Sequence, residues 1–446
     1  MPFESPPGSG HRLAARQSAR LIAAGIAAFW VYLAMYAFRK PIAVAMFADH
    51  APVWGMDFKT ALIMAQALGY ACSKILGIHV VSVYRGAGRA SLILGLIGIS
   101  WLALLGLAIL PPALAPLCMF LNGLPLGMIW GLVVSYLEGR RLTEVLTTIL
   151  TASFIVSSGL VKSVGSLLML QGVSAEWMPA ATGLLFSPLL IGAMLVLART
   201  PEPDAADRAE RGERMAMDRA ARRSFVSAYW LPLALLMAGY GLLVALRDYR
   251  DNFAAEMWAQ LGHAESPAIF VETEIPVTIA VLLGLATIGL IRRNRAALVA
   301  VHGLILAGGA LLCGSTLAWQ LGLIGPIAWV TLSGTGLYLA YAPFSAVLFE
   351  RVMAYTRYPG NAGFLIYMAD AFGYCASLIV LFWLSARGGP GTHAPAIYAE
   401  GCLIASGVLA CATAASLTRF ITRRRRGSRS RPGSRRHGSP AGARSL

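Results

Sequence analysis

Long runs of apolar residues restrict the fold of this 446-residue chain more than any other feature of its sequence. Twelve runs reach the roughly 20 residues that an α-helix needs to cross about 30 Å of hydrocarbon. They lie at 20–47, 59–83, 89–110, 113–137, 144–171, 179–198, 226–250, 268–291, 296–318, 325–349, 361–385 and 396–421. Only 13% of the residues are charged, whereas about 25% is usual for soluble domains. The sequence therefore predicts an all-α polytopic membrane protein with twelve transmembrane helices.

The loops between the runs alternate in charge. The sequences "YRGAGR" (84–89), "EGRR" (138–141) and "RRNR" (292–295) are rich in arginine, whereas "PPALAP" and "QLGLIG" contain no lysine or arginine. Basic loops stay on the cytoplasmic side of a membrane. We therefore expect both termini to lie in the cytoplasm, and the chain to be a multi-pass protein of the cell (inner) membrane.

A polar, arginine-rich stretch after the sixth run divides the chain into two six-helix halves. The last segment contains nine arginines and no acid, and its Arg/Ser/Gly/Pro composition is typical of disorder. We interpret it as a tail that contacts anionic lipid rather than nucleic acid, since no nucleic-acid-binding fold accompanies it. The predicted segments are a cytoplasmic N-terminal segment (1–19), the first half (20–198), a cytoplasmic linker (199–225), the second half (226–422) and a disordered basic cytoplasmic tail (423–446).

The two halves resemble each other in two places. The sequence "YLAMYAFR" puts Tyr32 seven residues before Arg39, and "YGLLVALR" puts Tyr240 seven residues before Arg247. Seven residues are about two helical turns, so each tyrosine shares a helix face with its arginine. The sequence "LNGLPLGMIWGLVVSYLEGR" also aligns with "LSGTGLYLAYAPFSAVLFER" at a similar offset. This duplication predicts the major facilitator architecture, in which the substrate site lies near the membrane midplane between two pseudo-symmetric halves.

Charged side chains inside the apolar runs are candidates for function, because placing one in a bilayer costs at least about 2.5–3.5 kcal/mol. The cations within the runs outnumber the acids, so a cavity between the halves is predicted to favour an anion. The planar fork of arginine suits carboxylate or phosphate, which it binds through two parallel hydrogen bonds. The deep cations are Arg39, Lys40, Lys74, Lys162 and Arg247.

Asp370 and Glu274 are the acids expected to balance these charges or to couple an ion. Asp370 is predicted to be the acid nearest to the mid-span lysines, and the first helix is predicted to continue beyond its two cations with a kink at Pro41. Arg250 is expected at the outer end of the seventh span, where its replacement by lysine has almost no effect.

The sequence lacks the motifs of common enzymes. No phosphate-binding loop, zinc-protease motif, nucleophile elbow or dinucleotide fingerprint occurs, so we expect neither an enzyme nor an ATP-driven pump, and no metal or cofactor. Gly123, Gly127 and Gly131 form a GxxxGxxxG face on the fourth run, which predicts close packing between helices.

Three short motifs are similar to those of the organophosphate:phosphate antiporters of the major facilitator superfamily. Those proteins carry Tyr-x-x-Arg-Lys in the first helix, Tyr-x-x-Ser-Lys in the second and a Leu-Arg-Tyr segment in the seventh. The counterparts here are "YAFRK" (Tyr36, Arg39, Lys40), "YACSK" (ending in Lys74) and "LRDY" (containing Arg247). The resemblance implies that Arg39 and Arg247 clamp an anionic group from opposite halves. It also implies that Lys40 and Lys74 add to the positive field.

These observations predict a secondary active transporter that works by alternating access on a small organic anion. A phosphorylated or carboxylated metabolite, moved by antiport or by ion-coupled symport, is the expected substrate class. The predicted substrate-binding residues are Arg39, Lys40, Lys74, Arg247, Tyr32, Tyr36, Tyr240 and Lys162, with Asp370 and Glu274 for coupling or charge balance. The alternative is a transporter-like sensor that binds an anion and signals to a partner without flux.

Overall fold

The computed structural model describes residues 9–83, 88–137, 143–201, 219–356 and 363–429. The earlier part of the chain forms α1 (Ser9–Tyr36), the 3₁₀-helix η1 (Pro41–Val44), α2 (Phe58–Val83), α3 (Arg89–Ile109), η2 (Pro112–Leu114), α4 (Ala115–Leu137), α5 (Thr143–Leu170) and α6 (Met178–Ala198). The later part forms α8 (Arg219–Asn252), α9 (Ala254–Gln260), α10 (Ile269–Gly289), α11 (Asn294–Gln320), α12 (Pro326–Pro343), the π-helix η3 (Phe344–Leu348), α13 (Phe349–Thr356), α14 (Gly363–Ser385) and α15 (Ala394–Arg429).

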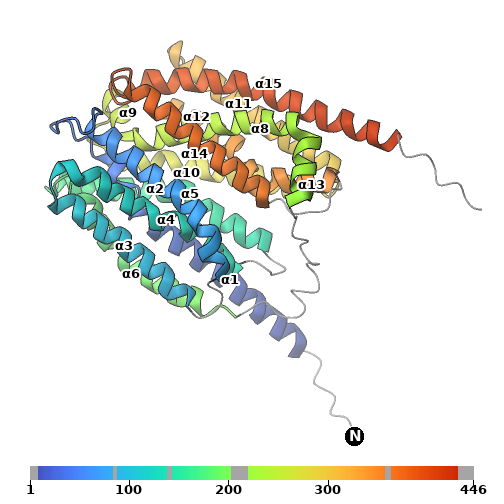
Figure 1. The fold of residues 1–446 in the computed structure, drawn as a ribbon, viewed down its shortest axis with the longest axis horizontal. Helices are drawn as coiled ribbons and strands as arrows, with labels where there is room; N and C mark the ends of the chain where they lie inside the picture. The colour runs from blue at the N-terminus through green and yellow to red at the C-terminus, as the bar shows by residue number, and fades with distance from the viewer. Residues whose placement is uncertain (1–8, 84–87, 138–142, 202–218, 357–362, 430–446) are drawn as a thin grey trace, which may run out of the picture.

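Most of the extensive helix contacts join helices that are not consecutive in the sequence (Figure 1). In the first set of helices, α1 to α6, α1 packs against α5 and α6, and α4 packs against α2 and α3. In the second set, α8 to α15, α8 packs against α14 and α15, and α11 packs against α12 and α15. Contacts of α2 with α14 and of α5 with α10 join the two sets. The short α9 contacts η1 and lies at one end of the bundle, opposite the end where α1 begins and α15 stops. We call this end the α9 end.

The helices have the length and composition that the apolar runs predicted. Ten helices of the described chain are long and apolar enough to cross a membrane. In addition, α1 contains the shorter apolar stretch Leu21–Tyr36, and α2 is 26 residues long. Each predicted run coincides with at least one helix. The prediction of a helical, multi-pass membrane protein is therefore confirmed.

The first helix ends earlier than its apolar run predicted. α1 stops at Tyr36, and a turn carries Arg39 and Lys40 before η1 begins at Pro41. Proline has no backbone N–H and suits the first position of a new helix, so the chain restarts there instead of continuing. The expected continuation with a simple kink is wrong. Because the two adjacent cations lie in a turn, their side chains reach different neighbours.

The glycine face of α4 packs directly against α2. A Cβ built on Gly123 falls 2.2 Å from a backbone oxygen of α2, and one built on Gly127 falls 2.7 Å from the Cβ of Ser73, so no side chain fits at either position. The predicted close packing is confirmed there. Beside this contact, the buried amide of Asn122 donates to the carbonyl oxygen of Phe38 at 2.9 Å. This bond fixes the turn that carries the first two cations.

Two helices extend beyond the predicted spans into the linker and the tail. α8 already begins at Arg219, with a kink where Tyr229 leaves helical geometry, and α15 continues to Arg429. A helix that is anchored in an apolar span extends into polar sequence until a breaker intervenes, and Pro432 follows shortly after. The structure describes 423–429 as the end of α15, within the segment that was predicted to be a disordered tail. The rest of the predicted linker and tail, 202–218 and 430–446, lies outside the described residues.

Candidate functional site

Arg39 rests against an aromatic ring instead of an acid. Its guanidinium carbon lies 3.8 Å from the centroid of the Tyr70 ring, which α2 supplies. Its Nε is buried without a hydrogen-bond partner, and the side chain makes no ion pair within the described part of the chain. A cation over an aromatic face gains about 0.5–2 kcal/mol, which does not replace a counter-ion. Arg39 therefore has unused capacity for an anion.

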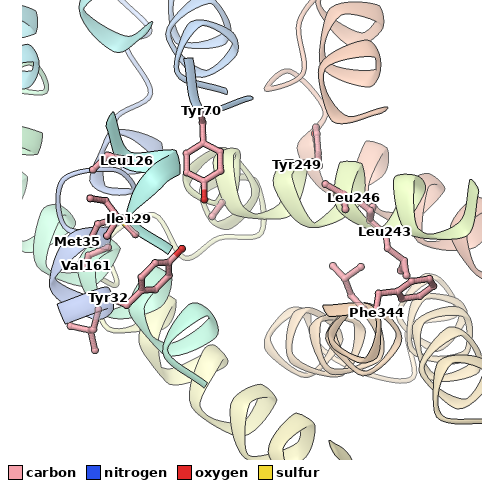
Figure 2. Packing of buried hydrophobic residues seen from close by; sticks show 14 of the residues in the cluster. Tyr32, Met35, Tyr70, Leu126, Ile129, Val161, Leu243, Leu246, Tyr249 and Phe344 are labelled. Carbon is pink, nitrogen blue, oxygen red and sulfur yellow. The ribbon is translucent and has the colours of Figure 1, made fainter. Parts of the chain in front are cut away.

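Lys74 shares the same ring. Its Nζ lies 5.3 Å from the Tyr70 centroid, and it too has no ion pair among the residues that the structure describes. Both cations are partly accessible. Figure 2 shows the hydroxyl groups of Tyr70 and Tyr32 pointing toward one another and away from the apolar side chains around Met35. The ring of Tyr70 also packs on Tyr374 of α14, with centroids 5.3 Å apart, so the second set of helices closes the other side. We call Arg39, Lys74 and Tyr70 the central cluster.

Arg247 of α8 lies near this cluster but has a counter-ion. Its Nη2 donates to Asp248 at 2.7 Å, its Nη1 donates to the Tyr341 hydroxyl, and its guanidinium carbon lies 4.6 Å from the Tyr341 ring centroid. Tyr36 and Tyr374 are within electrostatic range of both Arg39 and Arg247. The two arginines therefore approach one neighbourhood from different helix sets.

The repeated sequence positions make repeated contacts. Trp130 and Tyr341 hold the same position in the two aligned segments. The ring of Tyr32 meets that of Trp130 with centroids 5.2 Å apart, and the ring of Tyr240 stacks on that of Tyr341 at 5.4 Å. The Tyr240 hydroxyl also donates to Asp370 at 2.9 Å. The tyrosine of each Tyr-x₆-Arg pair thus packs on an aromatic residue two or more helices away.

Lys162 has a different acid from the one predicted, and Lys40 shares that acid. Both form ion pairs with Asp251 at the end of α8, and Ser158 of α5 donates to the same carboxylate. Lys40 also donates to Asn252 at 3.3 Å. Asp370 is occupied by Tyr240 and is not the partner of Lys162. For Lys162 the prediction is wrong because Asp251 stands in polar sequence that resembled a helix end, while tertiary packing buries it. Lys74, in contrast, lies within electrostatic range of Asp370 without forming an ion pair with it.

A second buried ion pair lies beside the two ion pairs of Asp251. Lys59, near the start of α2, has a side chain that is only 1% exposed, and its Nζ lies 2.6 Å from Glu256 of α9. The same Nζ donates to the carbonyl oxygen of Ala43 in η1 at 2.8 Å. Sequence reasoning missed both charged residues, since Lys59 is the first residue of its apolar run and Glu256 stands in a loop-like stretch after one.

Arg250 is buried, contrary to its expected place at an outer helix end. Its Nη1 donates to Glu274 of α10 at 2.5 Å, and the side chains are 5% and 10% exposed. A small cavity lined by these two residues, Lys162 and Trp258 adjoins the pair, where Oε2 of Glu274 and Nε of Arg250 lack partners. Such a polar cavity suits a buried water. Burial by α10 and α12 overrides the polar local sequence.

The arrangement offers cations and hydroxyls rather than metal ligands. Within the described residues, no group of three or more His, Cys, Asp or Glu side chains comes together. The central cluster can bind a negatively charged or hydrogen-bonding group through a guanidinium, an ammonium and a phenol.

Solved structures with similar folds are membrane transporters. A D-xylose–proton symporter matches with a TM-score of 0.57 and 14% identity, covering 87% of this chain and 96% of its own. A bacterial homologue of the human lysosomal transporter Spinster, in an inward-facing and occupied conformation, matches with a TM-score of 0.56 and 12% identity over 92% and 97%. A bacterial homologue of human peptide transporters matches with a TM-score of 0.60 and 11% identity over 92% and 99%. At these identities the likeness concerns the fold alone.

Comparisons of the sequence itself are less informative about activity. A search of curated proteins found no match. A family profile matches residues 41–424, most of the chain and all of the helices from η1 to α14. The chain therefore belongs to DUF5690, a protein family of unknown function, and it has the fold of membrane transporters.

Proposed function

We propose that the protein is a secondary active transporter that moves a small organic anion by alternating access. The observation that carries this proposal is which of the cations inside the helix bundle form an ion pair and which do not. Arg39 and Lys74 flank Tyr70 without an acid partner among the described residues, whereas Lys40, Lys59, Lys162, Arg247 and Arg250 each pair with a carboxylate. Uncompensated cations at membrane depth are expensive, so their retention favours a ligand that supplies the missing negative charge.

The proposal includes an architecture of twelve transmembrane helices in two halves that move relative to each other. Ten candidate spans, the apolar part of α1 and the 26 residues of α2 support twelve transmembrane helices in two six-helix halves. The matched contacts of Tyr32 and Tyr240 support the pseudo-symmetry of these halves. The basic loops support cytoplasmic termini in an inner membrane. Rocking of the halves around the central cluster exposes it to each side in turn.

The proposed substrate is a phosphorylated or carboxylated metabolite. An arginine fork and a nearby ammonium suit either group, and the "YAFRK" and "YACSK" motifs resemble those of organophosphate:phosphate antiporters. Arg247 approaches from the second set, and its pairing with Asp248 limits its free charge. We therefore assign the first contact with the anion to Arg39 and Lys74.

Uptake into proteoliposomes tests the proposal. Labelled organic phosphates and carboxylates are offered with phosphate preloaded inside, and separately with a pH gradient, which distinguishes antiport from proton-coupled symport. We expect saturable uptake of at least one anion, abolished by Arg39→Gln and retained by Arg292→Gln, which removes an exposed loop arginine. Saturable binding without flux indicates the sensor. Absence of both binding and flux for all anions contradicts the proposal.

A further inference from the structure

One short stretch of the second helix set receives every ion pair that connects the two sets in the described chain. Lys40 and Lys162 pair with Asp251, and Lys59 pairs with Glu256. The remaining ion pairs of the described residues, His50–Glu176, Arg247–Asp248 and Arg250–Glu274, each stay within one set. The lysines come from three separate elements: the turn before η1, the start of α2, and α5.

These pairs are buried on both sides. The lysine side chains are 8%, 1% and 5% exposed for Lys40, Lys59 and Lys162, and the two carboxylates are 12% and 11% exposed. A buried ion pair resists separation, because breaking it leaves a charge without a partner in a poorly solvated place. Separation of the helix sets at this point therefore requires that water, or another ion, reaches the charges.

The ion pairs between the two helix sets lie toward one end of the molecule. α9 and η1, which contact each other, mark the α9 end, and α1 begins and α15 stops at the opposite end (Figure 1). The loop charges place the α9 end away from the cytoplasm. The central cluster around Tyr70 occupies α2 and the turn after α1, so a path from it to the non-cytoplasmic side passes these ion pairs.

We propose that Lys40, Lys59, Lys162, Asp251 and Glu256 form an ionic latch that holds the α9 end closed and must open once in each transport cycle. The inference rests on the proposed function for its place in a cycle, but the closing contact itself does not. Asp251 is the dominant member, since it holds two lysines from two elements, whereas Glu256 holds one. Loss of Asp251 should therefore open this end more than loss of Glu256.

Distance measurements between the two helix sets test the latch directly. The full-length protein in lipid nanodiscs, with its six cysteines replaced, carries spin labels on cysteines at Ala51 and Ala264, which are exposed in loops of different sets at the α9 end. We expect Asp251→Asn to add a population at longer distance, and Glu256→Gln to add a smaller one. Glu265→Gln, which removes an exposed acid close to α9, is the matched control and should leave the distribution unchanged.

A charge exchange keeps the test valid if Asp251→Asn folds poorly. Lys59→Glu and Glu256→Lys each place like charges together and should lengthen the distance, whereas the double variant restores opposite charges and the short distance. Unchanged distances in all latch variants, or lengthening by Glu265→Gln as well, overturn the proposal. The measurement contains no substrate. A latch that opens in a protein without anion flux therefore contradicts the proposed function alone, and flux with an unresponsive α9 end contradicts the latch alone.

Discussion

Two regions of this protein treat buried positive charge in opposite ways. At the α9 end, Lys40, Lys59 and Lys162 each meet a carboxylate from the other set of helices. Around Tyr70, Arg39 and Lys74 lie against an aromatic ring and form no ion pair among the described residues. A cation in an ion pair is neutralised within the fold, whereas a cation without an ion pair can still attract an anionic ligand. The contrast separates residues that hold the structure from residues available for binding.

The largest loss of stability is expected when the shared acid of the ion pairs at the α9 end is removed. Asp251→Asn leaves two buried lysines without a counter-ion, and the loss of one partner in a buried ion pair costs about 3–5 kcal/mol. Thermal unfolding in detergent micelles should show a clear drop in melting temperature. Arg39→Gln removes a cation that has no acid partner, and should leave the melting temperature unchanged or raise it. Equal drops in both variants contradict the division into two regions.

A smaller effect is expected from a conservative change in the unpaired region. Arg39→Lys keeps the charge but replaces a planar fork of five donors by a point charge. We expect the apparent KM for the transported anion to rise by roughly tenfold or more, which corresponds to about 1.4 kcal/mol, with the melting temperature unchanged. Uptake assays at matched protein amounts measure this, with Arg292→Lys as the control. Activity equal to wild type makes Arg39 a structural cation.

An arginine-to-lysine substitution at an ion-paired position should change the stability of the protein rather than the KM. Arg250→Lys shortens a side chain that donates to Glu274 at 2.5 Å in a buried site, and the weaker contact should cost about 1 kcal/mol of stability. The KM should stay within twofold of wild type, because Arg250 faces Glu274 rather than the central cluster. A rise in KM like that of Arg39→Lys places Arg250 in the substrate site. The nearly unchanged transport agrees with the sequence-based expectation for Arg250→Lys, and the loss of stability is added by the buried contact with Glu274.

The smallest effect is expected at a loop pair that joins no helix sets. His50 lies 3.2 Å from Glu176, and both side chains are partly exposed. Partial burial raises the pKa of Glu176, but hydrogen bonds and His50 lower it by more, so that its pKa lies below the ordinary 4.5. A lowered carboxyl pKa stabilises the fold at higher pH, and this contribution is lost as the pH falls through the lowered value.

Glu176→Gln should therefore lower stability by no more than about 1 kcal/mol near neutral pH, since exposed pairs contribute little. The difference between variant and wild type should vanish as the pH falls below 4.5 through the pKa of the folded carboxyl. Melting temperatures across this pH range measure the effect. A difference that persists at the acid end, or one as large as that of Asp251→Asn, contradicts the assignment of this pair to the surface.

The sequence by itself determined the helical membrane class and most helix positions. Apolar runs of this length leave the backbone few alternatives to a helix in a bilayer. The glycine spacing on α4 predicted close helix packing, and the structure shows that α2 is the partner. The sequence also singled out Arg39 and Lys74 as charged residues within apolar runs. These properties depend on local composition and periodicity, which a single chain reveals directly.

Only the tertiary structure decided which charges neutralise each other. Asp251 and Glu256 stand more than 80 residues from their lysine partners in the chain, and nothing local distinguishes them from acids at an exposed helix end. The break after Tyr36 also separates the neighbours Arg39 and Lys40, sending one to Tyr70 and the other to Asp251. Pairing depends on which helix faces meet, and that is set by the packing of the whole bundle. The unpaired state of the central cluster, which carries the proposed function, therefore emerged only from the fold.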